Sequence, residues 1–159
     1  MSQLTEQEIV RRQSLEKIRE AGIDPYPAEA FKVTHLSSEI KAQFSEAKAE
    51  DFKVVSLSGR LMMKRIMGKA SFAELMDSAG RIQIYMSRDE ICPGEDKFLY
   101  NDLFKKLLDI GDFVGVKGFI FLTQTGEVTL HVTEFNLCHS SFKNPILSPV
   151  QLCPCMIVF

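Results

Sequence analysis

Phe72, Gln83 and Tyr85 are the side chains of this sequence whose types and spacing most readily suggest binding of a ligand. Apolar and polar residues alternate on both sides of a turn at Asp77–Gly80, as they do in two antiparallel strands joined by a hairpin. Closing the hairpin on that turn places Phe72 opposite Tyr85 and Glu74 opposite Gln83. The outer face of the hairpin is therefore predicted to carry two aromatic rings beside an amide.

This combination suits an unpaired nucleic-acid base. Stacking of a base on an exposed ring contributes about 1–3 kcal/mol of binding free energy. A neighbouring amide offers both a donor and an acceptor to the Watson–Crick edge of the base. The same pattern also fits a second arrangement, in which Phe72 and Tyr85 pack beneath an N-terminal helix or beneath residues 28–51. The alternation by itself leaves both arrangements open.

A second polar group is predicted on the strand that follows Gly126. Its inward residues are apolar, so the alternate side chains face outward. The outward side chains are Glu127, Thr129, His131 and Thr133. Glu127 lies at the rim of the sheet, where a carboxylate could accept a hydrogen bond from a base, although an ordinary solvated glutamate fits the pattern as well. His131 is expected to be a surface histidine rather than an acid–base group.

The charge of the sequence is uneven. The net charge of -2 argues against a protein that coats DNA, but residues 53–88 combine seven basic side chains with two acidic ones. The basic residues are Lys53, Arg60, Lys64, Arg65, Lys69, Arg81 and Arg88. A local positive field can steer a polyanion to one face, and Lys64, Lys69 and Arg81 are candidate phosphate contacts. A chance cluster on a solvated surface is the alternative.

No constellation of residues predicts catalysis or a resident metal. The sequence lacks the phosphate-binding GxxxxGK[ST] loop, the GxSxG nucleophile turn and the HExxH zinc motif, so no cofactor is expected. The four cysteines form no disulfide framework and no signal peptide precedes them, which indicates the cytoplasm. A zinc site is conceivable, although its spacing is unusual. Its ligands would be Cys138, His139, Cys153 and Cys155.

The order of the predicted elements indicates the fold class. A capping box at Thr5–Glu8 begins a helix of about four turns that ends before Gly22. The first strand runs from Phe52 with a bend or bulge at Gly59. The other predicted elements are a short helix around Ser37–Phe44, strands Ala70–Asp77, Arg81–Ser87, Asp112–Leu122 and Glu127–Leu137, and a helix over 96–109.

Three strands, one helix and two strands predict a mainly β protein, a five-stranded OB-fold barrel preceded by an N-terminal α-helix. Another small α+β sheet with the same order is the alternative. We expect three regions: the helix and its connecting segment at 1–51, the OB-fold domain at 52–138, and an irregular hydrophobic tail at 139–159. The tail is too short and too rich in proline to span a membrane.

Several runs of this sequence closely resemble the N-terminal anticodon-binding domain of class II lysyl-tRNA synthetases. The longest run is Gly59–Phe72, whose RIMGKASF stretch is more specific to the lysine enzyme than to its aspartate and asparagine relatives. The shorter runs are Ala21–Pro27, Gly80–Gln83, Cys92–Lys97, Asp109–Asp112, Gly115–Gly118 and Thr123–Glu127. Together these runs extend the resemblance over residues 5–137.

The resemblance implies binding of the anticodon stem-loop of lysine tRNA. In the family, the residue matching Phe72 stacks on the central anticodon base, and those matching Arg65 and Gln83 contact anticodon bases. The residue matching Glu127 reads the U-rich lysine anticodon. Weaker supporting contacts to phosphates or bases are expected from Lys64, Lys69, Arg81, Tyr85 and His131.

The resemblance fades after Leu137, where the family continues into a catalytic domain that binds ATP, Mg²⁺ and lysine and forms the homodimer. Residues 138–159 are expected to be a frameshifted, read-through or divergent end, so this chain alone is expected to bind RNA without catalysis. Two other functions stay open. One is a free-standing OB module that binds single strands without sequence preference, and the other is a protein-interaction or dimerisation module.

Overall fold

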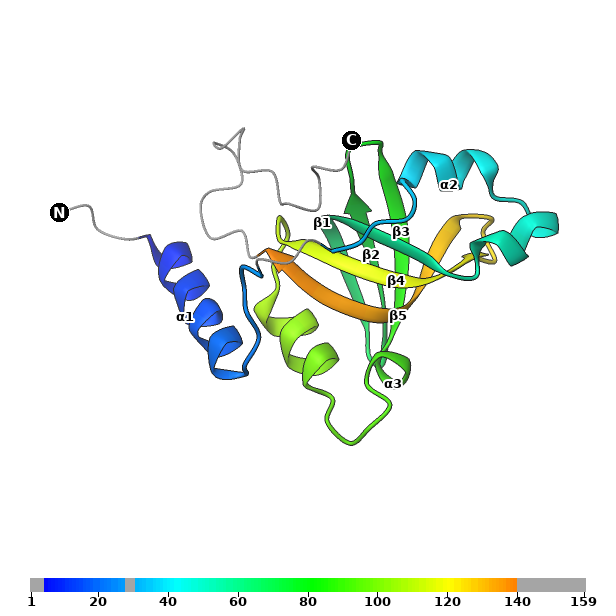
Figure 1. Ribbon diagram of the computed structural model, residues 1–159. Helices are drawn as coiled ribbons and strands as arrows, with labels where there is room; N and C mark the ends of the chain where they lie inside the picture. The colour runs from blue at the N-terminus through cyan, green and yellow to red at the C-terminus, as the bar shows by residue number, and fades with distance from the viewer. Residues whose placement is uncertain (1–4, 28–30, 140–159) are drawn as a thin grey trace.

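Five strands form a closed barrel in the computed structural model, which describes residues 5–27 and 31–139 (Figure 1). The strands are β1 (Val55–Met67), β2 (Ala70–Met76), β3 (Arg81–Ser87), β4 (Phe113–Leu122) and β5 (Val128–His139). Their order around the barrel is β1-β2-β3-β5-β4, in which only the β3–β5 pairing is parallel. The predicted order of three strands, a helix and two strands is confirmed.

The length of β1 allows the sheet to close. Its first half, from Val55 to Arg60, pairs with β4, and the residues from Arg60 to Met67 pair with β2. The register on the β2 side shifts between Leu61 and Met63, so of the bend or bulge predicted at Gly59 the bulge is wrong. Gly59 serves instead as a point of close approach, because a Cβ atom there would lie 2.7 Å from the carbonyl oxygen of Met76.

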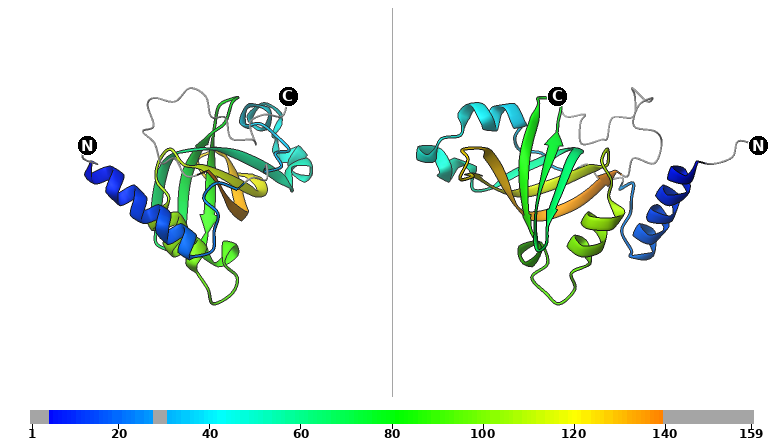
Figure 2. Two further views of the ribbon diagram at one scale, coloured as in Figure 1. Left: turned by 60° about the vertical axis from the view of Figure 1, so that its left-hand side comes forward. Right: turned by 180° about the vertical axis from the view of Figure 1, so that it is seen from behind.

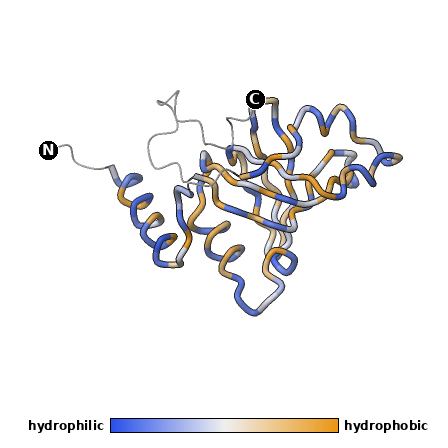
Figure 3. The backbone as a smooth tube through the Cα atoms, in the orientation of Figure 1, coloured by the Kyte–Doolittle hydropathy of each residue, from blue (hydrophilic) through white to orange (hydrophobic). Residues whose placement is uncertain are grey.

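The β2–β3 hairpin has the predicted register. Phe72 pairs with Tyr85 and Glu74 pairs with Gln83, with the chain turning over residues 77–80. Residues of β2 and β3 that point inward are nearly inaccessible, and their outward neighbours are partly exposed. Figure 3 shows the resulting alternation of hydrophilic and hydrophobic residues along the strands. Period-two patterning therefore fixes which side chains face the outside of the barrel.

The barrel core is filled by apolar side chains from every strand and from the helices packed against the barrel, with the helical segment η2 (Leu99–Leu107) contributing the most. The most deeply buried include Leu57, Leu61, Ile84, Met86, Tyr100, Leu103, Phe104, Val116, Leu130 and Val132. Tyr100, Leu103 and Phe104 belong to η2, a π-helical segment that closes one end of the barrel. The helix predicted over 96–109 is thus present but shorter, and a short helix α3 (Arg88–Ile91) precedes it.

The N-terminal helix α1 (Glu6–Glu20) begins and ends as predicted. Thr5 and Glu8 form the reciprocal capping box, and Gly22 takes the left-handed conformation with φ 77°. Leu15 and Ile18 are buried, whereas most other residues of α1 are exposed. The helix therefore contributes a narrow apolar stripe to the core.

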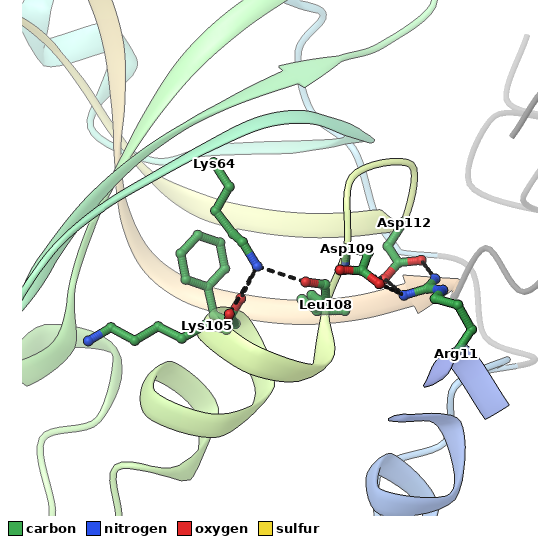
Figure 4. A network of polar contacts seen from close by, with 7 residues as sticks. Arg11, Lys64, Lys105, Leu108, Asp109 and Asp112 are labelled. Atoms are coloured by element: carbon green, nitrogen blue, oxygen red, sulfur yellow. Dashed lines mark hydrogen bonds and ion pairs between the residues drawn. The ribbon is translucent and has the colours of Figure 1, made fainter. Parts of the chain in front are cut away.

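Arg11 fixes α1 to the barrel through two carboxylates (Figure 4). Its guanidinium lies 2.6 Å from Asp109 and 2.5 Å from Asp112, whose side chain is completely buried. Burial lowers the pKa of Arg11, and the hydrogen bonds and charges of Asp112 and Asp109 together outweigh that effect and raise the pKa. This ion-pair cluster connects α1 to the loop between η2 and β4.

The connecting segment contains more helix than predicted. The short helix α2 (Ser37–Gln43) is confirmed, but the 3₁₀ helix η1 (Glu46–Phe52) is an additional element. Asp77 accepts hydrogen bonds from both the backbone and the hydroxyl of Ser37, which attaches α2 to the β2–β3 turn. Figures 1 and 2 place α1 beside η2 on one side of the barrel and α2 on the opposite side.

Candidate nucleic-acid interface

A hollow of about 600 Å³ lies on the outer face of the barrel, beside the β4–β5 turn. Its lining comes from all five strands and that turn, and combines aromatic, amide and hydroxyl groups with one guanidinium. The lining residues are Met63, Arg65, Phe72, Gln83, Tyr85, Phe121, Leu122, Thr123, Gln124, Thr125 and His131. The hollow therefore brings together five of the predicted site residues, which are Arg65, Phe72, Gln83, Tyr85 and His131.

An aromatic row crosses the outer face, and we define it as Phe72, Tyr85, His131 and Phe119. Each ring is the direct cross-strand partner of the next, so the row passes over β2, β3, β5 and β4 in turn. The successive ring centroids are 5.2, 5.0 and 4.6 Å apart. The row follows from strand pairing alone, because directly paired residues share a face of the sheet.

Phe72 and Tyr85 do not pack under the N-terminal helix. The part of that helix and connecting segment that the structure describes contributes no residue to the lining of the hollow. Helix α1 packs against η2 (Figure 2). Both rings are half-buried against neighbouring rings and leave part of their surface open to the hollow. The alternative left open by the sequence pattern is thereby rejected.

Gln83 lines the hollow with much of its hydrogen-bonding capacity unused. One amide proton is donated to the hydroxyl of Thr129 at 3.1 Å. Among the described residues no other partner of the amide is present, so its carbonyl oxygen and second proton are available to a ligand. Thr129 lies on the outward face as predicted, since it is the direct partner of Gln83, but its side chain is completely buried there.

Arg65 is the directly paired neighbour of Phe72 on β1. Its side chain is exposed, lines the hollow, and makes no hydrogen bond or ion pair with any residue in the described part of the chain. An unpaired guanidinium beside an aromatic ring can donate to a base edge or to a phosphate. Arg65 is therefore the cation of the site that needs no rearrangement before it binds a ligand.

Lys64 does not join the site, although it is adjacent to Arg65. Its ammonium donates to the carbonyl oxygens of Phe104, Lys105 and Leu108 at 2.9, 3.2 and 2.7 Å, as Figure 4 shows in part. These three bonds use all of its protons and satisfy the end of η2. Burial lowers the pKa of Lys64, opposed by the charges of Asp109 and Asp112. The ammonium therefore acts as an internal helix cap in this structure, which argues against the phosphate or base contact predicted for Lys64.

The other predicted phosphate contacts lie outside the hollow. Arg81 is exposed and forms an ion pair with Glu74 at 3.0 Å. Lys69 is exposed on the β1–β2 turn, and it makes no side-chain ion pair within the described ranges. The ammonium of Lys69 can thus bind a phosphate directly, whereas Arg81 would first have to release the carboxylate of Glu74.

Glu127 immediately precedes β5 and does not line the hollow. Its carboxylate is half exposed and lies 3.9 Å from the ammonium of Lys41. Its backbone is firmly held, because its N–H donates to the hydroxyl of Thr123 at 3.0 Å and its carbonyl accepts from the N–H of Thr123. The side chain is therefore placed beside the hollow with a surface contact that a ligand could replace.

His131 occupies the centre of the aromatic row. Its imidazole pairs with the carboxylate of Glu90, stacks on Phe119 at an interplanar angle of 18°, and meets Tyr85 edge to face. The side chain is 17% exposed. These contacts hold the ring in one orientation, which is a structural role and does not require proton transfer.

The contribution of β4 and of the turn after it was not predicted from the sequence. Phe121 and the residues Thr123–Thr125 line the hollow, and Phe119 completes the aromatic row. The alternation of aromatic residues at 119 and 121 was a signal for an outward aromatic face on this strand. That signal becomes informative only when the β4–β5 pairing is known.

The described residues contain no group of three or more His, Cys, Asp or Glu side chains that could hold a metal ion. For the conceivable zinc site, Cys138 is buried at the end of β5, while Cys153 and Cys155 lie outside the described residues. The proposed tail at 139–159 also falls almost entirely outside them. In the described chain, every helix is too short or too polar to cross a membrane.

A family model described as an OB-fold nucleic acid binding domain matches residues 55–137 of this chain. The chain is 57% identical to a lysine–tRNA ligase of Christiangramia forsetii over 143 residues, which is 90% of this chain and 24% of the relative. It is 53% identical to the ligase of Porphyromonas gingivalis over 89% of this chain, and 44% identical to that of Thermoanaerobacter pseudethanolicus over 84%. The chain thus spans about a quarter of the length of these relatives.

Proposed function

Because this chain belongs to the family of OB-fold nucleic acid binding domains, we propose that its outer hollow binds the unpaired bases of a tRNA anticodon. The anticodon of lysine tRNA is the proposed target, since the similar proteins are lysine–tRNA ligases. The attachment of lysine to tRNA is the activity of those relatives, and this chain covers only about a quarter of them. The proposal for the chain itself is RNA binding, without ATP or Mg²⁺.

The observation that carries the proposal is the juxtaposition of Phe72, Arg65 and Gln83 in one hollow. Arg65 is the cross-strand partner of Phe72, and Gln83 lies on the strand adjoining that of Phe72. A base stacked on the Phe72 ring would have an unpaired guanidinium on one side and a partly unused amide on the other. Stacking supplies affinity for any base, and the two polar groups supply hydrogen bonds that depend on its edge.

Glu127 would act at the margin of this site. Its carboxylate only accepts hydrogen bonds, so it favours bases that present an N–H donor, such as the imino group of uridine. The surface contact with Lys41 at 3.9 Å is weak enough to be exchanged. The proposed division of labour is that Phe72 provides affinity, whereas Arg65, Gln83 and Glu127 provide discrimination.

The test is the binding of the protein to lysine tRNA, measured beside a copy with a substituted anticodon. We expect weaker binding of the substituted tRNA, and we expect Phe72→Ala to lose about 1–3 kcal/mol of binding free energy through the missing stacking contact. Ile66→Ala is the matched control, because Ile66 is an exposed apolar residue on β1 that does not line the hollow. Equal affinity for both tRNAs would exclude anticodon reading and favour a module that binds single strands without sequence preference.

We also propose that the chain works in the cytoplasm, which agrees with the free, buried thiol of Cys92. The homodimer implied by the family resemblance is a separate proposal. Sedimentation of the protein without RNA tests it directly, because a dimer would show a sedimentation coefficient that increases with concentration.

A further inference from the structure

We infer that Phe119 forms a second stacking position, which takes another unpaired base of the same RNA strand that occupies the hollow. The inference rests on the proposed function and extends it from one base to two. It starts from the far end of the aromatic row, where Phe119 lies on β4 and contacts His131. Nothing in the pattern of charged residues points to this end of the row.

Phe119 is an aromatic residue with an exposed face. Its side chain is 38% exposed, and it is not part of the hollow's own lining. One face of the ring lies against His131, with centroids 4.6 Å apart and an interplanar angle of 18°. A base placed on its other face would therefore extend an existing two-ring stack, which is the geometry that single-strand binding proteins use for successive bases.

The stack is fixed before any ligand binds. His131 pairs with Glu90 on α3 and contacts the edge of Tyr85, so the ring that supports Phe119 cannot rotate freely. Phe119 is also held in the β4–β5 ladder as the direct partner of His131. A rigid platform loses little conformational entropy when a base stacks on it, whereas a flexible side chain would lose more.

The two stacking positions are separate. Phe72 and Phe119 are the ends of the row, with Tyr85 and His131 between them. Two bases can therefore stack on Phe72 and on Phe119 without sharing a ring. The ligand class is a flexible single strand of at least two unpaired nucleotides, as in an anticodon loop, and the second position should tolerate any base because every base has a π-face.

A tryptophan probe tests the second position. The sequence contains no tryptophan, so Phe119→Trp and Phe72→Trp each introduce a single tryptophan whose emission can be followed apart from that of the three tyrosines. Each variant is titrated with the lysine tRNA anticodon stem-loop, and with copies in which one loop nucleotide at a time is made abasic. Ile110→Trp is the control, because Ile110 is 60% exposed and lies outside the hollow.

We expect the stem-loop to quench the fluorescence of Trp at 119 and at 72, and to leave that at 110 unchanged. The quenching at 119 should disappear for one abasic position, and the quenching at 72 should disappear for a different one. Phe119→Leu, which keeps an apolar side chain but removes the ring, should weaken binding about five- to tenfold.

The outcomes distinguish this inference from the proposed function. Quenching at 72 without quenching at 119 overturns the second stacking position and leaves the proposed function intact. Disappearance of both signals at the same abasic nucleotide also overturns it, because one base would then serve both rings. Quenching at neither position rejects the proposed function together with the inference.

Discussion

Replacing Arg11 by methionine should destabilise the protein strongly, although Arg11 lies far from the hollow. The carboxylate of Asp112 is completely buried, and Arg11 is 16% exposed. After the substitution, the backbone N–H of Asp109 would still donate to this carboxylate at 2.9 Å, but the guanidinium that balances its charge would be gone. Removing one partner of a buried ion pair costs about 3–5 kcal/mol, because the remaining charge is left uncompensated.

We expect about 3 kcal/mol for Arg11→Met, the lower end of that range, because Arg11 is partly exposed and water can reach the vacated space. For a chain of this size each kcal/mol shifts Tm by about 2–4 °C, so the expected decrease is about 6–12 °C. The assay is urea or thermal unfolding followed by circular dichroism. Lys106→Met is the matched control, since it removes an exposed i,i+4 pair with Asp102 that contributes about 0.5 kcal/mol or less.

A double variant separates the buried charge from the loss of packing. In Arg11→Met/Asp112→Asn the buried charge is gone, while an amide oxygen still accepts from the backbone N–H of Asp109. We expect this variant to be more stable than Arg11→Met alone by about 1–2 kcal/mol. If Arg11→Met costs no more than Lys106→Met, or if the double variant gains nothing, the buried ion pair does not hold α1 in place.

Two further predictions concern the interface. Glu127→Gln and Gln83→Ala should each reduce the preference for the lysine anticodon over a substituted one, with little loss of general affinity, as measured by competition binding of the two tRNAs. An unchanged preference would remove these residues from base reading. The affinity should fall only weakly with salt, with a slope of log K against log salt of about -1.4. Two of the predicted RNA contacts, Arg65 and Lys69, have cationic groups that make no ion pair in the described part of the chain. Seven phosphate contacts at about 0.7 each would give a slope near -5. Such a slope would show that the whole basic cluster binds RNA.

The hairpin of β2 and β3 could be predicted from sequence down to its cross-strand pairs. Alternation fixes which residues share a face, and the turn at 77–80 fixes the register, so Phe72 had to oppose Tyr85. Both determinants are local. The same holds for α1, whose first turn is specified by the capping box of Thr5 and Glu8.

The features that were missed depend on contacts between distant segments. Lys64 and Arg65 are adjacent cations on one strand, yet only the end of η2, some forty residues further on, determines that Lys64 turns inward. Thr129 follows the alternation of an outward residue but is covered by Gln83 and neighbouring strands. The bulge after Leu61 appears where β1 changes partners from β4 to β2, which no local pattern specifies.

Closure of the barrel joins two separate sets of aromatic residues, here called half-sites, into the continuous aromatic row. The hairpin alone supplies Phe72, Gln83 and Tyr85, and the β4–β5 pair alone supplies Phe119 and His131. The parallel pairing of β3 with β5 is the contact that joins them, because it places Tyr85 directly beside His131. Since that pairing is non-local, a peptide containing only residues 70–87 would keep the rings of the first half-site and lose the continuous row. Recognition of more than one base is therefore a property of the closed barrel and not of its strongest sequence motif.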